Sequence, residues 1–372
     1  MTIHIFNPEH DIALASDLSN FTAPHAGRCL RYDMGFLPAL WAKEGDVILV
    51  DDEDWSLKQW KRVRSRIVSQ LGIEAPIVGE KRFLAFGKIS KDKELLGSLK
   101  SPLQDAEIRP WGWNRALCAQ LKRCGIPQVS LPSDQSLHTI RHLSHRRVAS
   151  EILSKIQVDG IIGESFECFQ PNEVEDLLQK YGHIVMKAPW SSSGRGLRFS
   201  SLDRTPLSIH MGWLCNLLKS QGSVMVEPFY HKVKDFGMEF YADEKGNVNY
   251  LGLSLFQTLN GAYTGNLLAT EDKKTELITR YVPVDLLNNI KQQICSLLNE
   301  LLNGQYVGPL GVDMMIVAQE NHDGFFLHPC VEINLRRTMG HVALSLTPSI
   351  DDVLRVMRIE YMDNHYKLKI DR

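Results

Sequence analysis

Acidic and amide residues interrupt two apolar stretches near the C-terminus, Gly311-Val312-Asp313-Met314-Met315-Ile316-Val317 and Phe325-Phe326-Leu327-His328-Pro329-Cys330-Val331-Glu332-Ile333-Asn334. Both stretches have the length and composition of buried strands. Side chains alternate across a strand, so Glu332 and Asn334 share one face while Val331 and Ile333 point to the other. Polar groups of this kind in a buried strand indicate a functional site.

The two stretches together predict a metal site. The short connection Asn321-His322-Asp323-Gly324 predicts a hairpin, which brings Asp313, Glu332 and Asn334 together as three hard oxygen ligands. Mg²⁺ prefers such ligands and completes its shell with phosphate oxygens and water. From these segments alone an alternative stays open, because an acid in a strand can also lie at a sheet edge or form an ion pair.

Composition narrows the class of protein. The 372 residues, 44% hydrophobic and 23% charged, predict an ordinary globular protein of two or three packed units. A net charge of −2 argues against a nucleic-acid partner bound through overall basicity, and no apolar stretch predicts a membrane partner. Seven scattered cysteines and a chain that starts directly with a strand pattern indicate reduced thiols in the cytoplasm.

Strands alternate with helices in the first third of the chain. We expect strands at 2–7 and 45–52 and helices at 55–71 and 113–124, the last ended by Gly125. This alternation predicts a small parallel α/β domain over residues 1–130.

The pattern changes after residue 131, where an α+β region with antiparallel sheet is expected. The expected strands are 183–187, 197–200, 223–230, 236–243 and 248–258, followed by the two C-terminal stretches. The expected helices are 134–156, 171–180, 283–302 and a last one that opens at Pro348-Ser349-Ile350-Asp351 and runs to about 362.

A strand that ends in Lys187 leads into a loop rich in serine and glycine, Ser191-Ser192-Ser193-Gly194-Arg195-Gly196. Glycine permits backbone conformations that aim N–H groups at an anion, and lysine supplies a point charge for phosphate. No Gly-Lys-Ser/Thr ends the loop, and a strand rather than a helix follows, which excludes a P-loop and a dinucleotide fingerprint. The alternatives are a phosphate-binding loop and an ordinary hairpin tip.

The segment Ser223-Val224-Met225-Val226-Glu227-Pro228-Phe229-Tyr230 is an apolar strand that ends in Glu-Pro-aromatic. Free backbone groups at such an end can read an adenine edge, and a nearby carboxylate can accept from ribose hydroxyls.

The order of these parts over about residues 131–350 resembles the ATP-grasp superfamily. The resemblance implies two α+β subdomains that clamp ATP, after a preceding α/β domain. It divides the chain into domain 1–130, a small lid subdomain 131–225, and a C-terminal subdomain 226–372 with the metal site.

The resemblance also implies roles for individual residues, with ATP and Mg²⁺ as cofactors and Mn²⁺ as the alternative ion. Asp313, Glu332 and Asn334 would hold the metal, and Arg336 would touch the γ-phosphate or an acyl phosphate. Lys187 would bind the phosphates of the nucleotide, and Ser191, Ser192, Ser193, Gly194 and Gly196 would form a flap over them. Glu227, Pro228 and Phe229 would hold adenine, and Asp235 or Glu239 would hold the ribose. Arg146 or Arg147 would be a second basic residue for the nucleotide, upstream in the sequence.

The chain departs from the family pattern at one position and leaves two segments open. No arginine stands just before Asp313, and Arg336 or Arg337 would replace that charge. Tyr263–Asn266 is either a loop over the substrate or an ordinary turn. For the turn Glu9-His10-Asp11 we favour helix capping by the acids over a part in substrate binding, although strand ends face the ligand crevice in parallel sheets.

The resemblance predicts an ATP- and Mg²⁺-dependent ligase that joins a carboxylate to an amine through an acyl phosphate. Two alternatives remain: a small-molecule kinase of the same superfamily, and a nucleotide-binding protein with little turnover. The partners would be ATP, a small-molecule carboxylate and an amine, and the sequence leaves open whether the chain is a monomer or a homodimer.

Overall fold

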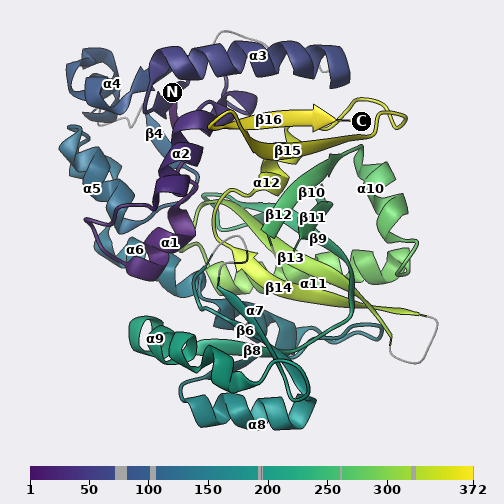
Figure 1. Ribbon diagram of the computed structural model, residues 1–372. Helices are drawn as coiled ribbons and strands as arrows, with labels where there is room; N and C mark the ends of the chain where they lie inside the picture. The colour runs from purple at the N-terminus through teal and green to yellow at the C-terminus, as the bar shows by residue number, and fades with distance from the viewer. Residues whose placement is uncertain are drawn as a thin grey trace. The chain divides into compact units, whose positions relative to one another are not determined.

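The computed structural model describes residues 1–71, 82–100, 106–191, 194, 196–259, 262–319 and 324–371. The chain forms two compact units (Figure 1). Unit 1 comprises Met1–Arg141, Gly265–Lys273 and Arg336–Arg372, and unit 2 comprises His142–Thr264 and Lys274–Leu335. Residues 336–372, which we expected to belong to the metal-binding subdomain, thus pack with the N-terminal domain.

Unit 1 is built on a parallel sheet with strand order β3-β2-β1-β4, which confirms the α/β domain expected from the sequence. Its strands are β1 (Thr2–Ile5), β2 (Val47–Val50), β3 (Arg82–Ala85) and β4 (Glu107–Pro110). Alternate residues of β2 enter separate cores, because Val47 and Leu49 belong to one cluster while Ile48 and Val50 belong to another. Both faces of the sheet are therefore buried, as is usual for parallel sheets.

Helices cover the two faces of this sheet. Those of unit 1 are α1 (His10–Ser16), α2 (His25–Met34), α3 (Glu53–Leu71), α4 (Lys93–Lys100), α5 (Arg115–Arg123) and α12 (Met339–Leu344), with the short 3-10 helices Leu37–Leu40, Phe86–Lys91 and Gln128–Ser130. Helix α5 begins at Asn114, whose side chain accepts from the Leu117 amide, and the chain turns at Gly125 with a φ of 95°. These are ordinary start and stop signals.

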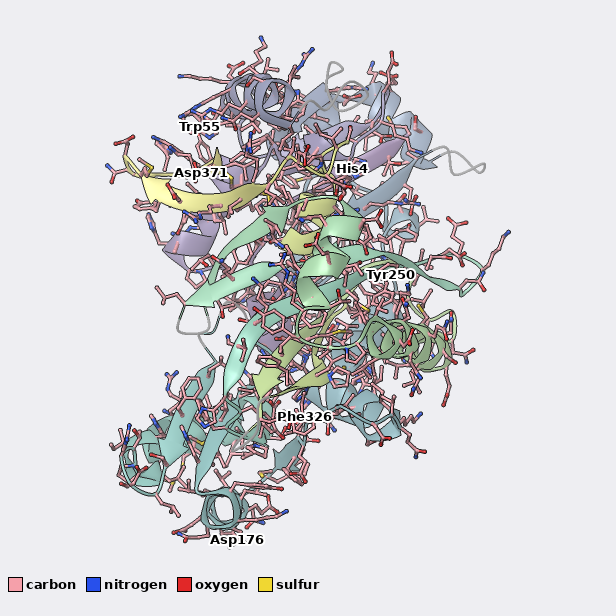
Figure 2. The ribbon with its side chains drawn as sticks, turned by 90° about the vertical axis from the view of Figure 1, so that its right-hand side faces the viewer. His4, Trp55, Asp176, Tyr250, Phe326 and Asp371 are labelled. Atoms are coloured by element: carbon pink, nitrogen blue, oxygen red, sulfur yellow. The ribbon has the colours of Figure 1, made fainter. Side chains whose placement is uncertain are left out.

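The expected C-terminal helix at 348–362 is wrong. The segment forms a hairpin of β15 (Arg355–Met362) and β16 (His365–Asp371), which also pairs with β12 (Ala262–Leu268) through residues 266–268. Asp363 and Asn364 make the turn with φ values of 52° and 64°, a conformation that short polar side chains tolerate. Met357, Leu368 and Ile370 enter the core beside α2 and α3, and the Trp55 ring lies 4.5 Å from that of His365. Figure 2 labels Trp55 on α3 and Asp371 at the end of β16.

The first sheet of unit 2 is antiparallel, with strand order β5-β8-β6-β7. Its strands are β5 (Phe166–Cys168), β6 (His183–Lys187), β7 (Leu197–Ser201) and β8 (Val224–Pro228), and its helices are α8 (Pro171–Tyr181), α9 (Met211–Gln221) and the 3-10 helix Leu207–His210. Val174 and Leu214 pack from the helices onto Ile184 and Val226 of the sheet. Asp176 lies on the exposed side of α8 (Figure 2).

The second sheet of unit 2 has strand order β10-β9-β13-β14, and its neighbouring strands are antiparallel. It contains β9 (Lys232–Ala242), β10 (Val248–Ser254), β13 (Gly308–Ala318) and β14 (Phe325–Asn334), with β11 (Phe256–Leu259), α7 (Arg146–Lys155) and α11 (Val284–Leu302) elsewhere in the unit. The predicted pairing of the two C-terminal stretches is confirmed, although residues 320–323 of their connection lie outside the described residues. Helices α6 (Asp134–Leu143) and α10 (Glu271–Ile278) cross the unit boundaries.

Tyr263–Asn266 belongs to strand β12, so both interpretations of this segment as a loop or turn are wrong. Tyr and Thr favour strands, and the flanking Gly and Asn misled the interpretation. Gly265 is required by close packing, because a Cβ there would lie 2.7 Å from the Met357 carbonyl oxygen.

Candidate active site

The three predicted metal ligands lie together on one face of the second sheet of unit 2. Asp313 is opposite Glu332 in the β13–β14 register, and Asn334 is opposite Gly311. Residues directly opposite one another in an antiparallel pair share a face. The Asn334 amide nitrogen donates to the Asp313 carboxylate at 3.1 Å. The hairpin expected from the sequence therefore brings Asn334 into contact with Asp313 and places Glu332 opposite Asp313.

This donor set suits Mg²⁺ better than a transition metal. Within the residues that the structure describes, no group of three or more His, Cys, Asp or Glu side chains could hold an ion. Two carboxylates and one amide oxygen are instead available at the β13–β14 pair. Mg²⁺ is commonly bound through one or two carboxylates, and it keeps waters and substrate phosphates in the rest of its shell.

Glycines keep this face open next to the acids. Gly237 of β9 is opposite Asp313, and a Cβ there would lie 3.0 Å from the Val312 carbonyl oxygen and 3.4 Å from an Asp313 carboxylate oxygen. Glu239, two residues further along β9, is opposite Gly311 and is buried. The residues just before Asp313 are uncharged, and the acid Glu239 lies across from Gly311 on the neighbouring strand. Asp235, at the other end of this row, accepts hydrogen bonds from Lys232 and Thr258.

Arg146 links Glu332 of strand β14 to the loop after β6. Its guanidinium donates to the Glu332 carboxylate at 2.9 Å, to the Ala188 carbonyl oxygen at 3.0 Å and to the Ser191 hydroxyl at 3.4 Å. Arg147, the next residue, points elsewhere and pairs with Glu167 at 3.1 Å. Of the two basic residues that the sequence left open, Arg146 is the one at the acidic face.

Lys187 and Glu227 form a buried ion pair at 2.5 Å between β6 and β8. Their residues are 6% and 5% exposed, so neither charge is screened by water. The backbone amide of Phe229 donates to the His183 carbonyl oxygen, and the Phe229 ring stacks on His183 at 3.9 Å. Pro228 is opposite Ile184 in the ladder. The Glu-Pro-aromatic segment is therefore the end of a strand in the same sheet as the lysine.

The loop after Lys187 is closely packed at its described residues. The Ala188 amide donates to the Gly196 carbonyl oxygen at 2.9 Å, and a Cβ at Gly196 would lie 2.4 Å from the Ser191 hydroxyl. Gly194 has a φ of 71°, which favours glycine. The predicted flap residues Ser192 and Ser193 lie outside the described residues.

His328 was given no role from its sequence, yet it lies near this ion pair. Burial lowers its pKa to about 4, with opposing influences from Glu227 and Lys187. Both ring nitrogens are buried without a hydrogen-bond partner among the described residues, and the Tyr230 ring lies 5.7 Å away. The register of the β13–β14 pair shifts between Asp313 and Met315, and Met315 is opposite His328. Because of this shift, the alternation of residues in the sequence could not predict which face His328 occupies.

Arg336 lies in unit 1, where it forms a bidentate pair with Asp11 at 2.8 Å for both contacts. The expected helix start is confirmed, because Glu9 is the N-cap residue of α1 and Asp11 lies in its first turn. The Glu9 side chain makes no capping bond, however, and pairs with Arg31. A partner 325 residues away could not be found from local sequence.

Among the residues that the structure describes, no helix is long and apolar enough to cross a membrane.

No family model matches the chain, and no curated protein matches it. Similar solved structures include N5-carboxyaminoimidazole synthetase from Staphylococcus aureus complexed with ADP, at 13% identity and a TM-score of 0.46, covering 96% of this chain and 82% of that chain. A biotin carboxylase–β-γ-ATP complex from Campylobacter jejuni has 12% identity and a TM-score of 0.48 over 96% of this chain and 75% of that chain. N5-carboxyaminoimidazole ribonucleotide synthetase from Thermus thermophilus has 15% identity and a TM-score of 0.42, with 81% of each chain covered. Because these TM-scores are below 0.5, the similarity is no basis for assigning residues or an activity.

Proposed function

We propose that the chain is an ATP- and Mg²⁺-dependent ligase of the ATP-grasp superfamily that joins a carboxylate to an amine. The observation that carries this proposal is the contact of Asp313 with Asn334, beside Glu332, which Arg146 contacts in turn. A strand face that gathers two carboxylates, an amide and an arginine is suited to a metal-bound polyphosphate. The order of motifs in the sequence supports the same function.

Asp313, Glu332 and Asn334 would hold one or two Mg²⁺ ions, with Mn²⁺ as the alternative. When bound, the ion neutralises charge on the transferring phosphoryl group. In the structure, Arg146 neutralises Glu332 at 2.9 Å. With ATP bound, we propose that this guanidinium turns to a phosphate, because Arg pairs as well with phosphate as with carboxylate.

Lys187 would bind the α- and β-phosphates from the end of β6, with Glu227 holding its ammonium group in place. The backbone of Glu227, Pro228 and Phe229 would hold adenine, and Asp235 the ribose. Ser191 to Gly196 would close over the phosphates, and Arg147 would be a structural residue. Arg336 would stabilise the γ-phosphate or the acyl phosphate.

The reaction has two steps. A carboxylate oxygen of the acid attacks the γ-phosphorus, and the bond to the β–γ bridging oxygen breaks to release ADP. The amine then attacks the acyl carbon, phosphate leaves, and the amine loses a proton to give the amide. Positioning and electrostatic stabilisation would supply most of the catalysis.

Hydroxylamine trapping tests this proposal. A panel of small carboxylic acids is incubated with the protein, ATP, Mg²⁺ and hydroxylamine, and ADP, phosphate and hydroxamate are measured. A ligase gives all three in equal amounts for the correct acid. ADP with a stable phosphorylated product and no free phosphate would favour the kinase. Acid-independent ATP binding without ADP release would favour the nucleotide-binding protein.

The proposal also includes a subdomain boundary at residue 225, a monomer or a homodimer as the assembly state, and a location in the cytoplasm. All seven cysteines are free in the structure, and three of them are buried, which supports a reducing compartment.

A further inference from the structure

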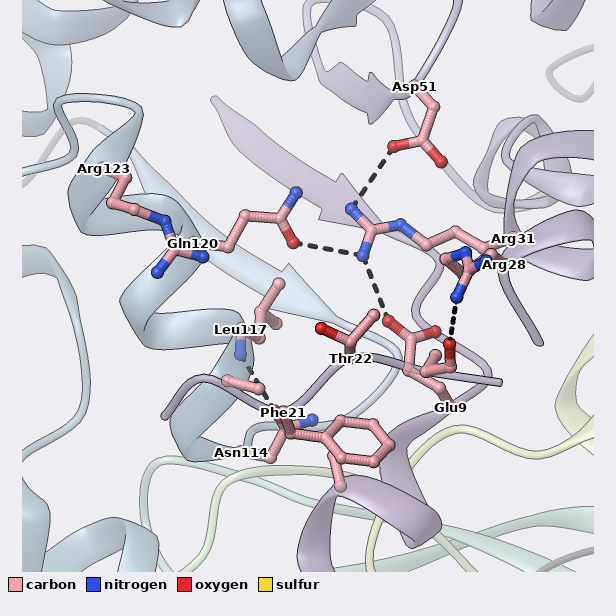
Figure 3. Close-up of a pocket in the computed structure, with 13 residues that line it drawn as sticks. Glu9, Phe21, Thr22, Arg28, Arg31, Asp51, Asn114, Leu117, Gln120 and Arg123 are labelled. Atoms are coloured by element: carbon pink, nitrogen blue, oxygen red, sulfur yellow. Dashed lines mark hydrogen bonds and ion pairs between the residues drawn. The ribbon is translucent and has the colours of Figure 1, made fainter. Parts of the chain in front are cut away.

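A polar pocket of about 240 Å³ lies in unit 1, outside the elements used above (Figure 3). Its walls come from the segment after β1, the loop 21–23, helix α2, the residue after β2 and one face of α5. In open α/β sheets, ligands bind outside the carboxyl ends of the strands, where the strand order reverses. The order β3-β2-β1-β4 reverses at β1, and the pocket lies after β1, β2 and β4.

Arg31 holds the acidic side of this pocket in place. Its guanidinium donates to Glu9 at 3.1 Å and to Gln120 at 3.1 Å, and it lies 3.5 Å from Asp51 (Figure 3). It is also 4.8 Å from the Phe86 ring centre, which fixes its plane. One residue thus connects the segments that follow β1 and β2 with helix α5.

This arrangement leaves an acceptor unused. The second carboxylate oxygen of Glu9 is buried and has no hydrogen-bond partner among the described residues. A buried carboxylate oxygen without a donor is costly, so a donor from a bound molecule would stabilise it. A hydroxyl or ammonium group in the pocket meets this need.

The lining of the pocket also carries unmatched positive charge. It contains Arg28, Arg31 and Arg123 against only Glu9 and Asp51, so positive charge is in excess. Both acids are used by Arg31, and Arg123 has no carboxylate partner in the part of the chain that the structure describes. Arg28 lies beside Arg31 and Glu9, whereas Arg123 lies across the pocket, next to Gln120 (Figure 3). Arg123 is therefore suited to a phosphate or carboxylate group on the side away from Glu9.

We infer that this pocket binds a small metabolite with an anionic group at one end and a hydroxyl or ammonium group at the other. The anion contacts Arg123, and the donor group contacts Glu9. The volume is below the usual range for drug-sized ligands, which matches a short molecule. All residues of this site belong to unit 1, so a test of this site does not depend on whether the proposed ATP site is correct.

Calorimetry with four probes tests the inference: glycerol 3-phosphate, glycerate, inorganic phosphate and glycerol. Glycerol 3-phosphate and glycerate carry both features and differ in their anion, so the tighter of the two identifies phosphate or carboxylate as the ligand group. The better probe should bind at least tenfold more tightly than inorganic phosphate and glycerol. Failure of both two-featured probes to bind at millimolar concentration would overturn the inference.

Variants locate the binding. Arg123→Gln should weaken the better probe about tenfold, and Glu9→Gln should remove its advantage over inorganic phosphate. Lys122→Gln is the matched control, because Lys122 is an exposed neighbour on α5 that does not line the pocket. Asp313→Asn should leave the probe's affinity unchanged, which separates this site from the ATP site. Unchanged affinity in Arg123→Gln would place the anion elsewhere and overturn the inference, even if Glu9→Gln failed to fold.

Discussion

Arg146, at the start of helix α7, donates from its guanidinium to the Glu332 carboxylate of strand β14 at 2.9 Å. The same side chain reaches the Ala188 carbonyl oxygen and the Ser191 hydroxyl, at the start of the serine- and glycine-rich loop. One arginine therefore connects the two sequence motifs that first indicated a nucleotide site. Its positive charge neutralises Glu332, which we propose as a metal ligand.

The two adjacent arginines give a matched test of this relationship. Arg146→Ala should weaken ATP binding at least tenfold, because it removes a cation that contacts both Glu332 and the loop. Arg147→Ala should change ATP affinity less than twofold, since Arg147 pairs with Glu167 away from the acidic face. Calorimetry of both variants, with thermal melts to confirm folding, makes the comparison. Equal effects of the two substitutions would contradict the assignment.

The buried pair of Lys187 and Glu227 predicts a large effect on stability as well as on binding. Lys187→Ala leaves Glu227 buried and uncompensated, which should cost about 3–5 kcal/mol of the free energy of unfolding. The double variant Lys187→Met/Glu227→Gln should recover most of that loss, because it removes both charges. It should still bind ATP weakly, since the phosphate contact is gone. Denaturant unfolding and calorimetry separate the two effects, and recovery of ATP affinity in the double variant would show that the lysine is only structural.

Two buried histidines predict a loss of stability in mild acid. Burial lowers the pKa of His328 to about 4 and that of His10 to about 4, whereas an unfolded histidine titrates near 6.5. Between these values the unfolded state binds more protons, so the free energy of unfolding falls as the pH falls from 6.5 to 4. Each histidine should contribute about 2 kcal/mol of this loss at pH 5.

The variants His328→Gln and His10→Gln should each reduce the slope of stability against pH in this range. His25 is exposed at the start of α2, so His25→Gln serves as the control and should leave the slope unchanged. Urea unfolding at several pH values gives the slopes. A slope that persists unchanged in the His328 and His10 variants would mean that other groups carry the acid sensitivity.

The C-terminal hairpin predicts opposite effects of two substitutions at one position. Asn364 has a φ of 64°, so Asn364→Gly should be neutral or stabilise the fold by up to about 1 kcal/mol. Asn364→Val should destabilise it by about 1–2 kcal/mol, because a β-branched residue resists this conformation. A helical segment would give the reverse order for glycine and valine. Thermal melts of the two variants therefore distinguish the hairpin from the helix that the sequence suggested.

The contrast between these two regions explains what the sequence could and could not predict. The sequence could predict that Asp313, Glu332 and Asn334 lie on paired strands, because a period of two and a short connection fix their register. Their role as metal ligands stays a prediction. The hairpin at 355–371 was missed because its Asp363-Asn364 turn follows a Pro-Ser-Ile-Asp stretch that also resembles a helix start. Its strand character comes from packing against α2 and α3, which local sequence does not contain.

For the same reason, the sequence could not predict contacts between residues that are far apart in the chain. The pairing of Arg336 with Asp11, and of Arg31 with Glu9 and Asp51, depends on where distant segments meet. No periodicity encodes such contacts. The sequence named Arg146 and Arg147 as equivalent candidates, and only the direction of each side chain at the start of α7 distinguished them.

Isothermal titration of ATP, with Mg²⁺ and then with EDTA, tests the central claim most directly. We predict that wild-type protein binds ATP at least tenfold more tightly with Mg²⁺, because Asp313, Glu332 and Asn334 hold the ion against the phosphates. Asp313→Asn and Glu332→Gln should abolish this difference, while Asp176→Asn, on the exposed side of α8, should preserve it. Equal affinity with and without Mg²⁺, or a metal dependence that survives both active-site substitutions, would contradict the account.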